Sequence, residues 1–233
     1  MGRKIHPKVF RLATIYSWDS KWFGNRNNYI SNLRADVGIR EYLMTRLKEA
    51  SVDHIEIDRN AEKITIAIFT AKPGVVIGRS GAGINDLKKE LKKRFYRGTR
   101  TNIIINVQEI KNPSLSARVV AQGVAQEIER RLPFRRSMKM ARERVMKSGA
   151  KGVKIQVSGR LNGADIARKE IVHDGSIPLH NLRADVSYAR VPARTIYGAI
   201  GIKVWIYRGE VFEESASDKK GSSIEKPKPR KRN

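Results

Sequence analysis

The chain has 233 residues, of which 48 are Lys or Arg and 23 are Asp or Glu, so its formal net charge is +25. A positive charge of this size indicates a polyanionic partner, and nucleic acid fits better than a membrane because no stretch approaches the ~20 apolar residues of a spanning helix. The chain contains no cysteine, which excludes disulfides, thiolate catalysis and zinc-ribbon sites, and we expect a cytoplasmic protein that folds into two domains.

Residues 1–28 are basic and aromatic and show no sustained periodicity. They include Arg3, Lys4 and Lys8 together with two tryptophans. Without a periodic apolar pattern, such a segment has little core of its own to bury. We therefore predict an N-terminal basic arm that becomes ordered by binding a partner surface.

Residues 29–110 have the pattern of a small α+β domain. The predicted elements, in chain order, are a helix at about 29–50, strands at 52–58 and 63–69, a glycine-rich loop, a helix with Ile84, Leu87, Leu91 and Phe95 on one face, and a strand at 102–107. In the second strand, Ile64, Ile66 and Ile68 alternate toward one side of the sheet. This order resembles that of a type II KH domain.

The loop of this domain contains Gly78-Arg79-Ser80-Gly81. It lacks the Gly-Lys-Ser/Thr of a Walker loop, and its glycines stand in the wrong order for a dinucleotide-binding fingerprint. Two interpretations remain, an ordinary turn with spare glycines and the Gly-x-x-Gly loop of a KH domain. In a KH loop the bare backbone of both glycines approaches the sugar-phosphate chain, and the next helix directs free N–H groups at the phosphates.

The KH interpretation assigns RNA-binding roles to residues in and beside this loop. The candidate contacts are Lys72, Gly78, Arg79, Ser80 and Gly81. We expect Val76, Ile77 and Ile84 to line a groove for about four unpaired nucleotides.

Residues 111–212 predict a second α+β domain, which begins after Asn112-Pro113 breaks the preceding strand. The predicted elements are helices at 114–131 and 134–148 and strands at 153–159, 164–172, 183–191 and 199–207. Two helices against a four-stranded sheet is the expected layering. Residues 213–233 are rich in Ser, Lys, Gly and Pro, and they predict a disordered basic tail.

The helix at 134–148 combines an apolar stripe with a strongly cationic surface. Phe134, Met138, Ala141 and Val145 recur at helical spacing, while only Glu143 offsets six cations. These cations are Arg135, Arg136, Lys139, Arg142, Arg144 and Lys147. An ordinary solvated face stays possible, but the charge imbalance favours contact with RNA.

No pattern of catalytic or metal-binding residues is evident. His6, His54, His173 and His180 are scattered without ligand spacing, and we expect them to be structural or close to RNA. Asp165 and Glu170 could pair for acid/base work, but nothing nearby supplies a nucleophile. We expect packing rather than base stacking for Trp205 and Tyr207. The chain is therefore expected to be no enzyme and to need no cofactor.

Several long motifs occur in one order along the chain. They are Gly2-x-Lys4-x-His6-Pro7, Pro73-Gly74-Val75-Val76-Ile77-Gly78, Phe134-Arg135-Arg136-Ser137-Met138-Lys139, Val157-Ser158-Gly159-Arg160-Leu161, and Tyr197-Gly198-x-Ile200-Gly201-x-Lys203-Val204-Trp205-Ile206. On these motifs the chain resembles the bacterial ribosomal protein S three family, from residue 1 to about 210. One departure is a slightly longer stretch between Phe95 and Thr101.

The resemblance implies a structural protein in the head of the small ribosomal subunit that binds rRNA and touches ribosomal proteins S ten and S fourteen. It further implies that Arg135, Arg136 and Lys139 line the channel through which mRNA enters and help to unwind structured message. Other candidates for rRNA contact are Arg3, Lys4, Lys8, Arg142, Arg160 and Arg168. A free regulatory KH protein, or a lyase acting on damaged DNA as assigned to eukaryotic relatives, stays open as an alternative.

Overall fold

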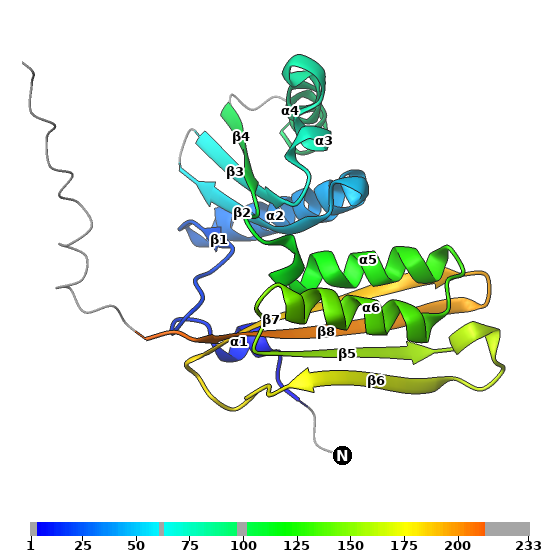
Figure 1. The fold of residues 1–233 in the computed structure, drawn as a ribbon. Coiled ribbons are helices and arrows are strands. Elements are labelled where there is room, and N and C mark those ends of the chain that lie inside the picture. Colours follow the sequence, from blue (N-terminus) through cyan, green and yellow to red (C-terminus); the bar gives the residue numbers. More distant parts are fainter. Residues whose placement is uncertain (1–3, 61–62, 97–101, 213–233) are drawn as a thin grey trace, which may run out of the picture.

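A computed structural model of the chain describes residues 4–60, 63–96 and 102–212, which form two α+β domains and an N-terminal segment that contacts both (Figure 1). Arg3, the predicted tail at 213–233 and most of the departure between Phe95 and Thr101 lie outside the described residues. Within the described ranges, no helix is both long and apolar enough to cross a bilayer.

The first domain has the predicted KH order of elements. They are α2 (Arg26–Arg46), β2 (Val52–Arg59), β3 (Lys63–Thr70), α3 (Pro73–Ile77), α4 (Ala82–Phe95) and β4 (Asn102–Glu109). Strand β3 pairs antiparallel with β2 and parallel with β4. The alternation along β3 buries Ile64, Ile66 and Ile68 as predicted, and Leu91 of α4 packs in the same core. The first helix begins three residues earlier than the predicted position 29.

The second domain places two helices on one face of a four-stranded antiparallel sheet, as predicted (Figure 1). The helices are α5 (Ala117–Glu129) and α6 (Phe134–Lys147), and the sheet runs β6 (Arg168–Gly175), β5 (Gly152–Gly159), β8 (Gly198–Glu210) and β7 (Ala184–Thr195). Alternating apolar residues of β5 and β8 meet the apolar stripe of α6 in one core.

Two strand boundaries in this domain differ from the prediction. The strand predicted to begin at Ala164 begins at Arg168, because a short 3-10 turn, Leu161–Gly163, interrupts the chain with Asn162 and Gly163 at positive φ. Strands β7 and β8 continue past their predicted ends and form a long hairpin that turns at Ile196 and Tyr197.

The N-terminal segment is ordered by the chain itself, so the prediction of an arm that needs a partner is wrong for residues 4–25. Helix α1 (Pro7–Phe10) leads to Arg11, whose side chain is fully buried. The Arg11 guanidinium donates hydrogen bonds to the carbonyls of Pro7, Pro178, Leu179 and Asn181 at 2.8–3.2 Å. Further on, β1 (Ser20–Lys21) adds a strand beside β2.

The two domains meet where α5 begins. Ser116, which caps the N-terminus of α5, donates a hydrogen bond of 2.6 Å to Asp53 Oδ1 on β2. His54 Nδ1 lies 3.0 Å from the other oxygen of the same carboxylate. Burial alone would raise the pKa of Asp53, but the hydrogen bonds with His54 and Ser116 outweigh burial and hold that pKa below its usual value. A charged group thus joins the first sheet to the first helix of the second domain.

Candidate nucleic-acid interface

The Gly-x-x-Gly loop joins α3 to α4 through three left-handed residues. Gly78 has φ +70°, Ser80 has φ +52° and Gly81 has φ +79°. A Cβ on Gly78 would lie 3.0 Å from the backbone nitrogen of Gly83, whereas a Cβ on Gly81 would meet nothing within 4 Å. The first glycine therefore permits the tight turn, and the second leaves an open backbone surface that a ligand can approach.

The loop exposes positive charge and free backbone donors. Gly81 is the N-cap residue of α4, and no side chain caps the first turn of that helix. The first N–H groups of a helix lack internal partners and sit at the positive end of its dipole, so they favour an anion. Arg79, in the loop directly before this helix end, has an exposed side chain, and so does Lys72 at the start of α3. Gly78 to Gly81 form the loop itself, whereas Lys72 lies at the other end of α3, and a phosphate is the ligand that the start of α4 beside Arg79 suits.

The predicted groove beside the loop is only partly present. Val76 is 1 % exposed and belongs to the domain core, so its predicted role in lining an RNA groove is wrong. On that side Val76 borders a cavity of about 210 Å³ whose charged lining residues are one cation, Arg46, and three carboxylates, Glu49, Asp86 and Glu90, so its net negative charge disfavours phosphate. Ile77 is 38 % exposed and stays available to a ligand.

The cations at the start of α6 point away from the core. Phe134 and Met138 are buried as predicted, while Arg135, Arg136 and Lys139 are exposed. Arg135 Nη2 lies 3.0 Å from Glu170 Oε1 on β6, but this pair is open to solvent and holds the guanidinium weakly. Among the described residues, Arg136 and Lys139 have no ion-pair partner, so their charge is available to a polyanion.

The other predicted RNA contacts are dispersed. Lys4 is exposed, whereas Lys8 forms an ion pair of 2.7 Å with Asp19 and helps to hold the N-terminal segment. Arg142 lies 3.8 Å from Asp174 on β6, and Arg168 lies 3.7 Å from Glu170 on the same strand. The structure does not bring these residues together with the loop into one site.

Two of the four histidines pack against aromatic rings. His54 stacks on Phe69 at 4.1 Å between ring centroids, and His6 meets Tyr188 edge-on at 4.7 Å. Burial and the nearby charge of Lys8 lower the pKa of His6, which favours its neutral form. Within residues 4–60, 63–96 and 102–212, no group of three His, Cys, Asp or Glu side chains could hold a metal ion.

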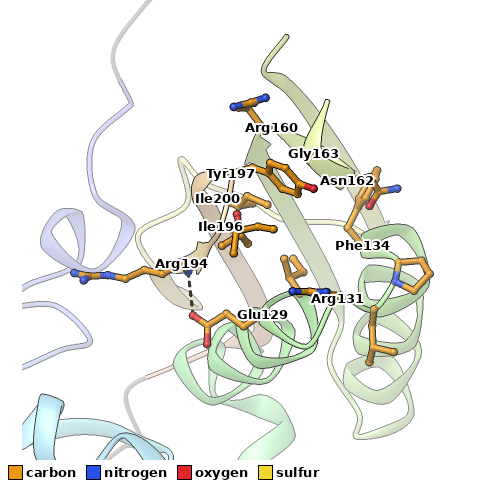
Figure 2. Close-up of a pocket in the computed structure, with 14 residues that line it drawn as sticks. Glu129, Arg131, Phe134, Arg160, Asn162, Gly163, Arg194, Ile196, Tyr197 and Ile200 are labelled. Carbon is orange, nitrogen blue, oxygen red and sulfur yellow. Dashed lines mark hydrogen bonds between the residues drawn. The ribbon is translucent and has the colours of Figure 1, made fainter. Parts of the chain in front are cut away.

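A second feature, which the sequence did not predict, lies at the far end of the second domain. A cavity of about 430 Å³ opens where the α5–α6 turn, the 3-10 turn before β6 and the tip of the β7–β8 hairpin meet (Figure 2). Its lining includes Arg131, Arg160 and Tyr197. These residues come from three separate turns, so no periodic pattern could have linked them.

Comparisons with known proteins cover most of the chain. A family model described as "KH domain" matches residues 38–115, and one described as "Ribosomal protein S3, C-terminal domain" matches residues 124–206. The chain is 48 % identical to small ribosomal subunit protein uS3 of Enterococcus faecalis, across 95 % of the chain and 99 % of that protein. Its identity to uS3 of Shouchella clausii is 47 %, across 94 % and 98 %, and to uS3 of Paraburkholderia phymatum 45 %, across 99 % and 89 %.

Proposed function

The chain belongs to the uS3 family of small ribosomal subunit proteins, and from this premise we propose that it binds rRNA with its KH loop and guides incoming mRNA along the start of α6. The role is structural and involves no enzymatic activity, in keeping with the family. The observation that carries the proposal is the combination of an open Gly-x-x-Gly backbone with a separate cationic helix face, on which Arg136 and Lys139 have no ion-pair partner among the described residues.

The KH loop supports contact with a ribose-phosphate backbone. Gly81 presents bare backbone, no side chain caps the first turn of α4, and Arg79 adds an exposed charge. None of these groups reads a base edge, so the loop positions RNA rather than selecting its sequence. We assign this surface to rRNA of the subunit head.

Helix α6 supports contact with a moving strand. Its buried stripe anchors the helix against β5, while Arg136 and Lys139 stay exposed on the outer side. Charges fixed on a rigid helix can bind successive phosphates as a strand slides past, because each contact is weak and independent of sequence. This arrangement suits a role in holding mRNA open where it enters the subunit. In the proposed position the chain also contacts the ribosomal proteins S ten and S fourteen.

The loop assignment is tested by replacing Arg79 and Ser80 with Asp, which gives the loop Gly-Asp-Asp-Gly. Three units of charge change at a phosphate-binding surface should lower affinity for small-subunit rRNA by about tenfold or more and flatten its salt dependence. The control pairs Arg34→Asp with Ser31→Asp on the exposed side of α2, which makes the same charge change elsewhere. Equal losses of affinity in the two variants, measured by filter binding with matched thermal melts, would contradict the loop assignment.

The α6 assignment is tested in reconstituted small subunits. Arg136→Ala with Lys139→Ala should slow translation through a stable mRNA hairpin and leave an unstructured message unaffected. Arg144→Ala with Lys147→Ala removes the same charge from exposed positions near the other end of α6 and is the control. Equal translation rates through the hairpin for wild type and the first variant would refute the proposed role.

A further inference from the structure

The cavity at the far end of the second domain begins where the cations of α6 begin. Phe134, the first residue of α6, lines this cavity, and Arg135 and Arg136 follow it directly on the helix. The cavity therefore lies within one helical turn of those arginines. Its volume of about 430 Å³ lies within the ~300–1,000 Å³ typical of small-molecule sites.

The charges at the cavity are complementary to a nucleotide. Figure 2 shows Arg131 directed toward the interior, and among the described residues its guanidinium has no ion-pair partner. Arg160 lies at the rim, where its guanidinium is 3.0 Å from Asp165 Oδ1, and the Arg194 side chain points away from the cavity. The one lining carboxylate, Glu129, is already engaged, because it accepts a hydrogen bond of 3.0 Å from the Arg194 backbone and lies 3.6 Å from Lys48 Nζ.

An aromatic ring is fixed at the mouth of this cavity. Tyr197, at the turn of the β7–β8 hairpin, is 51 % exposed and packs against Gly163, where an added Cβ would lie only 2.9 Å from the ring. The Arg160 guanidinium lies 5.8 Å from the ring centroid and further restrains it. A restrained, half-exposed ring beside apolar walls is the surface on which unpaired bases stack in single-strand binding proteins.

Two residues that line the cavity have positive φ angles, which are uncommon for residues other than glycine. Arg131 has φ +64° and Asn162 has φ +56°. Arg131 takes this conformation where α5 ends, since its N–H and that of Leu132 bond to the carbonyls of Ile128 and Glu127, and Asn162 takes it in the turn before Gly163. These two turns place a guanidinium and an amide with both donor and acceptor groups beside one cavity.

We propose that this cavity binds one unpaired base of the RNA strand held by α6, with the base stacked on Tyr197 and a neighbouring phosphate paired with Arg131. The inference rests on the proposed function, since α6 brings the strand to the cavity. A base bound in the cavity cannot pair with another base. The cavity would therefore oppose re-formation of an RNA hairpin, in addition to the phosphate contacts of α6. The remaining walls, Ile128 and Ile200, are apolar and suit the face of a base.

The test uses the full chain and two short single-stranded RNAs of equal length, one ordinary and one with abasic riboses throughout. Tyr197→Leu removes the ring but keeps apolar bulk, and Tyr197→Phe keeps the ring. Tyr29→Leu is the matched control, because Tyr29 is 50 % exposed and lies on α2 of the other domain. Arg136→Ala with Lys139→Ala reports on the α6 phosphate contacts alone.

We expect Tyr197→Leu to weaken binding of ordinary RNA about fivefold or more, as for the loss of one stacked base. Binding of abasic RNA should not change, and Tyr197→Phe and Tyr29→Leu should both bind ordinary RNA as wild type does. The proposed base pocket would be overturned if Tyr197→Leu bound ordinary RNA with unchanged affinity, or if it lost the same affinity for abasic RNA as for ordinary RNA. Binding of an acidic peptide at the cavity, without binding of RNA there, would also overturn it. If instead the α6 double variant binds both RNAs normally, the failure lies with the proposed function.

Discussion

Removal of the buried guanidinium of Arg11 should release the N-terminal segment from the second domain. Arg11→Met retains most of the apolar volume but removes the charged donor that faces four carbonyls, three of which belong to residues 178–181. Each charge-assisted hydrogen bond stabilises the fold by ~1.5–3 kcal/mol, whereas burying the guanidinium costs several kcal/mol. In the variant, the buried carbonyls that lose their donor also destabilise the fold, because they are no longer hydrogen-bonded. Together these effects predict a loss of about 3 kcal/mol in the free energy of unfolding.

For a chain of this length, that loss corresponds to a fall in Tm of about 6–12 °C. Thermal melts should be paired with hydrogen exchange, which should show lost protection at Phe10, whose N–H bonds to the His6 carbonyl at 3.0 Å. Arg190→Met makes the same substitution at an exposed position of β7 and should melt as wild type does. If Arg11→Met melts with the control and residues 4–25 keep their protection, the account of the buried guanidinium is refuted.

Three further variants test other contacts. Gly83→Ala would place a Cβ 2.7 Å from the Val76 carbonyl and should cost ~1–3 kcal/mol in urea denaturation, while Gly74→Ala, which meets nothing within 4 Å, should be neutral or slightly stabilising. Arg59→Met leaves the buried Asp36 carboxylate without its ion-pair partner and should cost ~3–5 kcal/mol by the same assay. The pKa of Asp53 in the folded protein lies below its ordinary value of 3.8, so the charged carboxylate stabilises the fold above that pH. Thermal melts should therefore show wild type to be more stable than Asp53→Asn at neutral pH, and this difference in stability should shrink as the pH falls below 3.8.

Periodic patterns predicted the parts of the fold that depend on burial. The alternation of Ile64, Ile66 and Ile68 fixed a strand and its buried face, and the stripe of Phe134 and Met138 fixed the inner face of α6. In both cases a local spacing of two or 3.6 residues is enough to determine which side chains enter the core. The loop at Gly78 could also be predicted, since only glycine tolerates the close approach and positive φ found there.

Features held by contacts between distant segments could not be predicted in this way. The N-terminal segment carries no apolar period, and its order depends on Arg11 reaching carbonyls some 170 residues later in the sequence. The Asn162-Gly163 pair does signal a turn, but it does not determine how many residues separate that turn from the next strand, so the strand start at Arg168 was misplaced. The cavity around Tyr197 depends on three turns meeting, which tertiary packing alone decides.

Tethered-iron cleavage tests the two RNA surfaces most directly. Because the chain has no cysteine, Ser80→Cys and Lys139→Cys each supply a single thiol that can carry a chelated iron into reconstituted small subunits. Hydroxyl radicals released at position 80 should cut nearby rRNA, and those released at position 139 should cut bound mRNA. Cleavage at neither position above the level of cysteine-free protein treated in the same way would contradict the account.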